Sequence, residues 1–342
     1  MKHLLAAVVM AAGFAVAVAH AQSKYSIEPP AGWQVPRTPD GKPDLQGVWG
    51  NNSVTPMTRP TQWKDKTVVT DAEVDELKSF LAKSVEEGGD AIFGNLIQMA
   101  LNAKDKGEFK QVSYDPTTGN YNQFWMAERE WDNRTSLIID PPNGQFPALT
   151  KAAEERRAAA AARLRTRERP AGPEDLPMQE RCISYGAPRI GSNYNSYVQI
   201  FQSPETVVLM QEMIHDARVV PLTGKPHLPA NIRQLHGDSR GRWDGDTLVV
   251  ETTNYINGFQ GSTNNVKLTE RYTRVSPEFI HWQVTVDDPA TWTQPWTFMI
   301  RLKKTDSLIY EYACHEGNYS MEGILAGARA EEAKAAKSKS RR

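Results

Sequence analysis

The sequence predicts an α+β protein, in which an extended lead-in and a helical segment pack on an antiparallel β core. Three observations predict this fold class. Prolines and glycines crowd the chain after its first residues, apolar residues at helical spacing follow, and short runs rich in Val, Thr, Ile, Tyr and Trp fill the C-terminal half. The predicted organisation is a leader (1–21), a lead-in with a first strand (22–60), a mainly helical segment with a short β hairpin (61–177), the β core (178–326) and a charged tail (327–342).

The first 21 residues predict an export leader. Lys2 and His3 precede an apolar run over 4–18, and the small-residue sequence Ala19-His20-Ala21 follows. The alternative, a membrane anchor, needs roughly 20 apolar residues, and this run is shorter. No later run is long enough to span a bilayer. We therefore expect a soluble periplasmic or secreted protein without a membrane span.

Three helices are predicted between residues 61 and 177. Thr70 and Glu73 have the spacing of a capping box at the start of a helix over 71–84, and a more apolar helix follows over 91–103. Residues 151–169 are rich in Ala, Glu and Arg, which indicates a solvated surface helix. Between 121 and 139, strand-forming residues and the turn at 141–144 predict the hairpin.

The β core is predicted from seven short runs with turn residues between them: 206–213, 218–222, 247–253, 268–274, 279–286, 296–302 and 308–313. Two of them alternate clearly. Ile280 and Trp282 share one face of their run, and Phe298 and Ile300 share one face of theirs. Half-buried strands of this kind are typical of an antiparallel barrel or, alternatively, a sandwich. The tail after the core is expected to be a frayed, solvated end.

Composition excludes several classes of partner. Loss of the leader removes Lys2, which leaves 39 basic residues against 41 acidic ones. A net charge of about −2 gives no attraction to nucleic acid. Phosphate-binding loops and a G-x-S-x-G nucleophile motif are absent from the sequence. We predict no cofactor, with a divalent metal as the alternative, and leave the oligomeric state open.

Cys182 and Cys314 are the two cysteines of the chain. In an exported protein an even number of cysteines favours a disulfide, so we predict a bridge between them. The alternatives are a buried free pair and a metal-binding pair, although no C-x-x-C sequence supports the metal.

Polar residues in predicted loops are candidates for acid–base catalysis, because a His beside a carboxylate has a pKa near neutrality and an oriented ring. The candidates are His215, Asp216 and Arg218; His236, Asp238 and Arg240; and His315. Each His could instead bond to backbone in a turn. His215, His236 and His315 could also converge on zinc or iron, but no spacing fixes two ligands on one element.

Two glutamates lie inside predicted strands. Glu251 and Glu311 would be candidate acids or bases if they pointed into the barrel, where Arg271 or Arg301 could pair with them. Outward orientation on a solvated strand face is the alternative. Aromatic residues of the same region could line a ligand cavity or simply fill the core; the candidates are Trp243, Trp282, Trp296, Tyr310 and Tyr312.

Four segments, 36–49, 213–233, 237–255 and 310–319, resemble a family of uncharacterised exported bacterial proteins. This resemblance implies no activity, substrate or catalytic residue. Gly47-Val48-Trp49 resembles the G-x-W sequence of lipocalin and calycin barrels, in which the Trp closes one end of the barrel. The second resemblance favours a lipocalin-like barrel over a sandwich.

Two functions follow from these predictions. The first is an acid–base enzyme, such as a lyase, isomerase or hydrolase, acting on a small apolar or aromatic molecule. The second is a non-catalytic carrier or binding protein of the cell envelope, and a third, structural role would need no pocket. Convergence of His215, Asp216, His236, Arg240 and His315 on one pocket would favour the enzyme, and their dispersal would favour the carrier.

Overall fold

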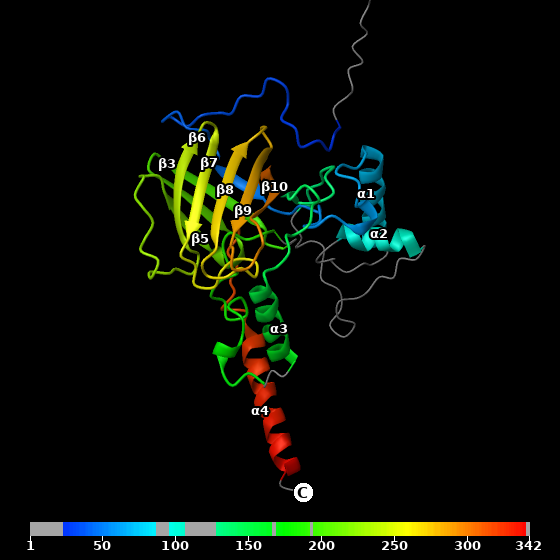
Figure 1. Ribbon diagram of the computed structural model, residues 1–342, viewed down its shortest axis with the longest axis vertical. Helices are drawn as coiled ribbons and strands as arrows, with labels where there is room; N and C mark the ends of the chain where they lie inside the picture. Colours follow the sequence, from blue (N-terminus) through cyan, green and yellow to red (C-terminus); the bar gives the residue numbers. More distant parts are fainter. Residues whose placement is uncertain (1–22, 87–95, 107–127, 166–168, 192–193, 340–342) are drawn as a thin grey trace, which may run out of the picture.

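The computed structural model describes residues 23–86, 96–106, 128–165, 169–191 and 194–339. It consists mostly of one antiparallel sheet with a few helices, as Figure 1 shows. The α+β class predicted from the sequence is therefore confirmed. The predicted leader lies outside the described residues.

The elements follow the predicted order along the chain. The strands are β1 Gly47–Gly50, β2 Ile138–Asp140, β3 Tyr197–Ser203, β4 Thr206–Gln211, β5 Ala217–Pro221, β6 Asp238–Asp244, β7 Thr247–Thr253, β8 Lys267–Arg274, β9 Phe279–Asp287 and β10 Trp296–Thr305. The helices are α1 Asp71–Glu86, α2 Leu96–Lys106, α3 Lys151–Arg165 and α4 Tyr319–Lys339, with short 3₁₀ turns η1 Thr61–Trp63, η3 Pro173–Asp175 and η4 Met213–His215.

The sheet runs in the order β5-β4-β3-β1-β10-β9-β8-β7-β6, with β2 added beside β10. The edge strands β5 and β6 lie against each other, and a Cβ placed on Gly241 would come within 2.8 Å of Val220 Cγ1. No hydrogen-bonded ladder joins these two strands in the described part of the chain. The sheet is therefore curled but not closed, and the predicted barrel is not established.

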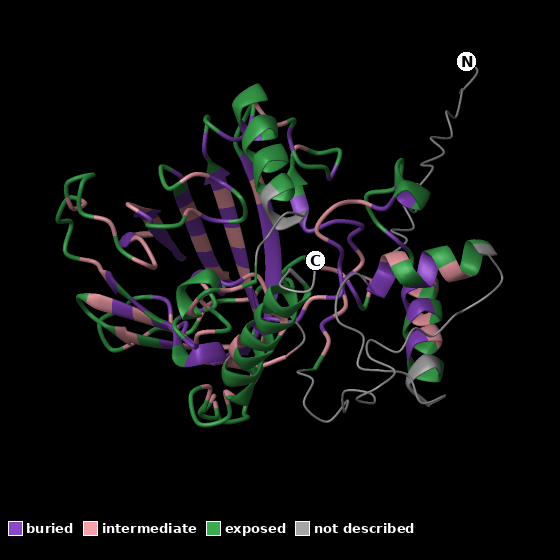
Figure 2. Ribbon diagram, turned by 90° about the horizontal axis from the view of Figure 1, so that it is seen from below, coloured by how far each residue is buried: buried purple, intermediate pink, exposed green. Residues whose placement is uncertain are grey.

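Alternating side chains fill the concave side of this sheet. The register places Ile280, Trp282 and Val284 of β9 beside Leu302, Ile300 and Phe298 of β10, all of them buried. Figure 2 shows the same alternation of buried and less buried residues along the strands. The predicted face assignments of both strands are confirmed, because burial of one face in two imposes the period of two.

The lead-in runs along the sheet rather than forming a unit of its own (Figure 1). Trp33 Nε1 donates to the carbonyl of Arg274 at 3.4 Å. Trp49 of the G-x-W sequence is fully buried, and its Nε1 donates to the carbonyl of Leu45 at 2.9 Å. The Arg274 guanidinium lies over the Trp49 ring, 5.5 Å from its centroid. These contacts hold β1 in the middle of the sheet.

Helices α1 and α2 form a second, smaller hydrophobic cluster with lead-in residues such as Tyr25 and Val54. The capping box is confirmed, because the Thr70 amide donates to Glu73 Oε2 at 2.8 Å and the Glu73 amide donates to Thr70 Oγ1 at 3.3 Å. Helices α1 and α2 match the predicted pair, although residues 87–95 lie outside the described part.

A buried charged cluster covers the outer face of β9 and β10. Arg301 Nη1 lies 3.4 Å from Glu130 Oε1, and Arg134 pairs with Asp132 at 2.6 Å. Burial raises the pKa of Glu130 to about 7, because the charges of Arg301 and Lys303 do not replace the lost hydration. Burial, assisted by Arg134 and Arg301, lowers the pKa of His281 to about 4.

Several predicted elements need correction. Residues 308–313 form no strand, because β10 already has β9 and β1 as neighbours. Strands β3 and β6 were not predicted. The tail is not a frayed end: α4 covers most of it and projects from the sheet (Figure 1), capped by Asn318 Oδ1, which accepts from the Met321 amide at 3.3 Å. Of the predicted hairpin, only β2 falls in the described residues, and it pairs with β10.

Candidate functional site

The predicted catalytic residues lie in separate places, but two pairs of them are in contact: Asp216 with His236, and Asp238 with Arg240. Asp216 and His236 meet at Ser184, whose hydroxyl donates to Asp216 Oδ2 at 2.9 Å. His236 Nε2 lies 3.0 Å from Ser184 Oγ and 3.2 Å from Asp216 Oδ1. Ser184 is only 1% exposed, and one ring nitrogen serves both contacts. The cluster therefore fastens the segment around Ser184 to the turn before β5 and presents no accessible nucleophile.

Asp238 and Arg240 form a second cluster at the start of β6. Asp238 accepts from His227 Nδ1 at 2.9 Å, from the Leu228 amide at 2.9 Å and from Arg240 Nη1 at 2.5 Å. Burial opposes ionisation of Asp238, but these bonds and the Arg240 charge outweigh it and hold its pKa below the ordinary value. An ionised, fully paired carboxylate of this kind stabilises the 226–228 loop.

Arg218 points into the sheet, where it meets a glutamate that the sequence reasoning missed. Its Nη1 and Nη2 donate to Glu270 Oε1 and Oε2 at 2.6 and 2.8 Å. Tyr272 Oη and Trp282 Nε1 donate to Glu270 Oε2 at 2.7 and 3.1 Å. Burial alone would lower the pKa of Arg218, but the Glu270 carboxylate outweighs it and holds that pKa above its ordinary value.

The sheet interior around Arg218 and Trp282 is filled with side chains. Trp282 and Trp296 are 3% and 1% exposed, and Trp243 packs against the same cluster. The cavity beside Arg218 and Trp282 has a volume of about 10 Å³, which is enough for one water. The structure supports the alternative that these tryptophans pack the core, because the rings of Trp282 and Trp296 both pack against the ring of Phe298.

The remaining candidates lie at the surface and do not meet one another, although Glu311 also belongs to the cleft described below. Glu251 lies on the outer face of β7, where Lys267 Nζ is 3.0 Å away and holds the Glu251 pKa below its ordinary value. His215 and His315 are exposed. Glu311 is exposed on a segment without strand structure. Neither glutamate points into the sheet, since Glu251 has the register of the outward face and Glu311 is not in a strand.

A cleft of about 670 Å³ opens beside the disulfide bond. We call it the tyrosine cleft, because four tyrosines contribute to its walls. Its lining consists of Gln179, Glu180, Cys182, Tyr194, Asn195, Tyr197, Glu212, Tyr310, Glu311, Tyr312, Ala313, Cys314, Gly317, Asn318 and Ser320. Two of the predicted ligand-binding residues, Tyr310 and Tyr312, lie here, apart from the tryptophans with which the sequence grouped them.

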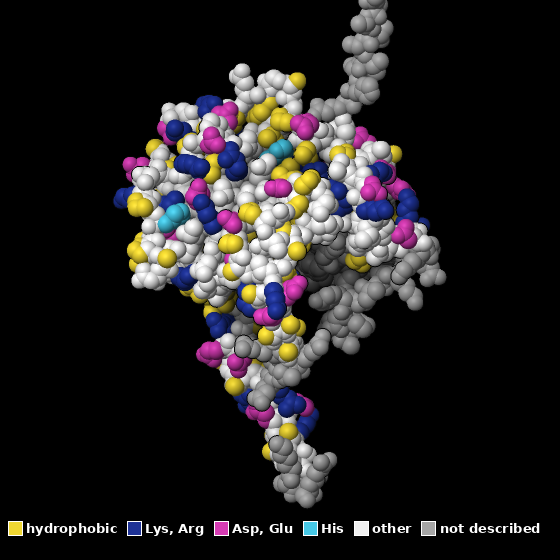
Figure 3. All heavy atoms as spheres, in the orientation of Figure 1, with side chains coloured by type: hydrophobic (Ala, Val, Ile, Leu, Met, Phe, Trp, Pro, Cys, Tyr) yellow, Lys and Arg dark blue, Asp and Glu magenta, His cyan; other side chains and the backbone are white. Residues whose placement is uncertain are grey.

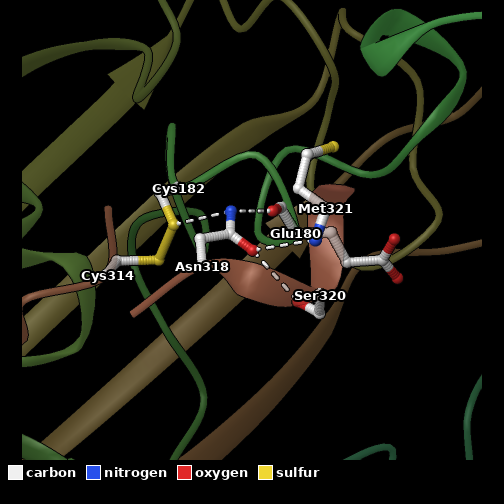
Figure 4. The surroundings of a disulfide bond; sticks show 6 residues. All are labelled: Glu180, Cys182, Cys314, Asn318, Ser320 and Met321. Carbon is white, nitrogen blue, oxygen red and sulfur yellow. Dashed lines mark hydrogen bonds between the residues drawn. A yellow bond between two sulfur atoms is a disulfide. The ribbon is translucent and has the colours of Figure 1, made fainter. Parts of the chain in front are cut away.

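The predicted disulfide between Cys182 and Cys314 is confirmed, and it joins two walls of the cleft. Asn318 reinforces the junction, as Figure 4 shows: its Nδ2 donates to the carbonyl of Glu180 at 2.8 Å and lies 3.4 Å from Cys182 Sγ. The same side chain accepts from Ser320 Oγ at 3.0 Å. The segment near Glu180 is thus fixed to the start of α4.

Glu212 is the buried acid of the cleft. It follows β4 and is 3% exposed. Its Oε1 accepts from the Tyr310 amide at 3.4 Å, whereas its Oε2 has no hydrogen-bond partner among the described residues. Burial raises the pKa of Glu212, and the backbone bonds, the Asn195 side chain and the Arg189 charge reduce the effect without cancelling it. A carboxyl group poised in this way can hold a proton or a positive charge.

Aromatic rings form the body of the cleft. The rings of Tyr194 and Tyr312 meet edge to face with their centroids 6.2 Å apart. Tyr310 is 70% exposed. The nearby Arg189 lies outside the lining, since its guanidinium stacks 4.7 Å from the Tyr185 ring centroid and donates to the carbonyls of Tyr194 and Asn195. The cleft therefore offers ring faces and edges to a ligand.

The described part of the chain contains neither a cluster of metal ligands nor a membrane-spanning helix. In the described part of the chain, no group of three or more His, Cys, Asp and Glu residues is placed to hold a metal ion. None of the described helices is long and apolar enough to cross a bilayer. On the face seen in Figure 3, acidic and basic side chains are interspersed.

Sequence reasoning missed Tyr194, Tyr197 and Glu212. A usable pattern was present, because the predicted disulfide already joined 182 to 314. That link brings the stretch after Cys182 close to the stretch before Cys314. Tyrosines within a dozen or so residues of either cysteine were therefore the candidates to examine together.

The comparisons with known proteins do not show a family for this chain. No family model and no curated protein matches the chain. Among solved structures, a mutant of the fluorescent protein UnaG is similar at 13% sequence identity, over 33% of this chain and 72% of that one, with a TM-score of 0.21. A similarity at this TM-score carries no argument about fold or function. Membership in the exported bacterial family stays a prediction.

Proposed function

We propose that this protein is an exported, non-catalytic binding protein for a small molecule with an aromatic or apolar body, held in the tyrosine cleft. The single observation that carries the proposal is the cleft itself, which combines a volume of about 670 Å³ with four tyrosines and the buried Glu212. Pockets of roughly 300–1,000 Å³ with aromatic walls and a few polar groups are typical of small-molecule sites.

Binding is favoured over catalysis because most of the predicted acid–base residues lie elsewhere, and of them Glu311 alone is in the lining. His215, Arg240 and His315 do not line the cleft, and Asp216 and His236 are committed to Ser184. Their dispersal is the outcome that favours a carrier. A catalytic role would have to rest on Glu212, whose raised pKa and unpaired oxygen suit a general acid, so an acid–base enzyme is the second candidate.

Export and a closed barrel belong to the same proposal. The disulfide supports an oxidising compartment, because such bonds persist outside the cytoplasm. The contact between β5 and β6 supports closure of the sheet into a lipocalin-like barrel, with the filled interior acting as a scaffold for the cleft at its edge.

The test is a thermal-shift screen of small aromatic compounds on the oxidised protein. A ligand at about 100 times its Kd stabilises the folded state by about 2.7 kcal/mol. Hits should weaken about tenfold or more in Tyr312→Ala, because a ring of the wall is lost. Tyr319→Ala is the matched control, since Tyr319 is 80% exposed and outside the lining. Equal effects of both variants would reject the cleft as the site, and chemical conversion of a hit would favour the enzyme.

A further inference from the structure

The charges that line the tyrosine cleft share one sign. Glu180, Glu212 and Glu311 are the charged residues of the lining. Among the described lining residues none carries a positive charge. Arg189 is the nearest cation to Glu212, and it stacks on Tyr185 outside the lining. A ligand in the cleft therefore experiences a negative potential, which is strongest near the buried carboxyl group because water screens it least there.

The buried polar atoms of the cleft are acceptors that lack donors. Glu212 Oε2 and Asn195 Oδ1 are both buried without a hydrogen-bond partner in the described residues. Because both atoms are closed to solvent, a charged group in the cleft interacts with the Glu212 carboxyl mainly through its electric field. This field attracts a cation and repels a carboxylate.

The rings of the cleft suit the same kind of ligand. Aromatic faces attract cations through the ring quadrupole, and groups of rings beside a carboxylate are a recurring site for ammonium ions. Tyr194 and Tyr312 lie edge to face, so they present surfaces in two directions. Tyr197 and Tyr310 add two more rings to the walls.

We infer that the ligand of the tyrosine cleft is an organic cation, an amine or quaternary ammonium carried on an apolar or aromatic body, with Glu212 as its counter-charge. This inference rests on the proposed function and specifies the ligand class of that same site. The positive group is held by the field of Glu212, reinforced by Glu180 and Glu311, and the body of the ligand lies against the tyrosines.

The test compares three probes of nearly equal size: phenethylamine, 2-phenylethanol and phenylacetate, which are cationic, neutral and anionic. Isothermal titration on the oxidised full chain should give phenethylamine at least about tenfold tighter binding than 2-phenylethanol, the fold-change expected for a charge-assisted contact. Phenylacetate should bind weakest. Glu212→Gln should bring the affinities for phenethylamine and 2-phenylethanol to within about threefold of each other.

The pH dependence of binding distinguishes a cationic ligand from the main alternative, a neutral ligand. A protonated Glu212 could donate to a neutral ligand, and then binding would strengthen as pH falls. Cation binding instead weakens as pH falls, because protonation of Glu212 removes the counter-charge. The groups that face Glu212 are Arg189, Tyr197 and the Tyr310 amide. Arg189 and the Tyr197 hydroxyl keep their charge state between about pH 5 and about pH 8. Among these groups, a change of binding over this pH range therefore reports the titration of Glu212.

Two variants separate an effect on ligand binding from an effect on folding. Glu212→Gln keeps the side-chain shape, and thermal unfolding checks its fold. Glu251→Gln, on the outer face of β7, removes a carboxylate away from the cleft and should leave the preference for phenethylamine unchanged. Tighter binding of 2-phenylethanol that Tyr312→Ala weakens would overturn the cation inference and leave the proposed function standing. No binding by any probe up to about 10 mM would overturn the inference, and the wider aromatic screen then decides the proposed function.

Discussion

Glu270 offers the sharpest test of how the sheet interior is built. It is fully buried, and its carboxylate accepts four hydrogen bonds: two from Arg218, one from Tyr272 and one from Trp282. Glu270→Gln keeps the shape of the side chain but removes its charge. The amide group also turns N–H donors toward the guanidinium, which is itself a donor.

The expected loss of unfolding free energy follows from the burial of the Arg218–Glu270 ion pair. Side-chain exposures of 3% for Arg218 and 0% for Glu270 leave the guanidinium without solvent once the carboxylate is gone. Breaking a buried ion pair on one side typically costs about 3–5 kcal/mol of unfolding free energy, because an uncompensated charge is left behind. Replacing both partners by apolar residues, as in Arg218→Met with Glu270→Leu, should come within about 2 kcal/mol of the wild type.

Urea unfolding provides the measurement for Glu270→Gln and for the four proteins of a cycle: wild type, Arg218→Met, Glu270→Leu and the double variant. Glu251→Gln is the control. Glu251 pairs with Lys267 on the surface, so its replacement should cost about 1 kcal/mol or less. The reasoning fails if Glu270→Gln loses less than about 1 kcal/mol. It also fails if the double variant is as unstable as the sum of the two single ones, because the two groups would then act independently.

Three further predictions concern other regions. The raised pKa of Glu130 makes the wild type lose stability as pH rises from 4.5 to about 7. Glu130→Gln lacks this titration, so its unfolding free energy should gain about 3 kcal/mol relative to the wild type over that range. Parallel curves of stability against pH would contradict this. Cys182→Ser with Cys314→Ser should lose about 2–5 kcal/mol in urea unfolding and weaken ligand binding, and unchanged binding would show that the cleft does not need the bridge. Gly241→Ala should lose about 1–3 kcal/mol if β6 packs tightly on Val220, and a neutral effect would argue against that contact.

The strands of the core could be predicted where one face is apolar throughout. β9 is such a case, because burial of every second residue leaves its period of two in the sequence. β6 could not be predicted, since Arg240 and Arg242 face outward and the inward positions include Gly241, whose small size admits β5. Residues 308–313 mislead in the opposite direction, because their strand-forming composition comes without a buried face: Leu308 and Tyr310 are 72% and 70% exposed.

The inward-pointing carboxylate of Glu270 could be predicted from the sequence only in part. Glu270 shares the parity of Leu268 and Tyr272 in β8, so its inward direction follows from alternation alone. Its partner does not, because the contact with Arg218 joins strands that are separated by a long stretch of chain. The same limit applies to the tyrosine cleft, where residues from several distant segments converge, and only the disulfide connected any of them in advance.

The disulfide links the compartment of the protein to its proposed activity. Two walls of the cleft come from segments around Cys182 and Cys314 that contain little regular structure. Hydrogen bonds within a sheet cannot position such segments, so the bridge and Asn318 carry that task. A chain kept reduced would retain the sheet, whose core lies apart from the bridge, but would lose the constraint that joins the cleft walls. Oxidation after export would thus complete the binding site, which couples ligand binding to the compartment in which the ligand is met.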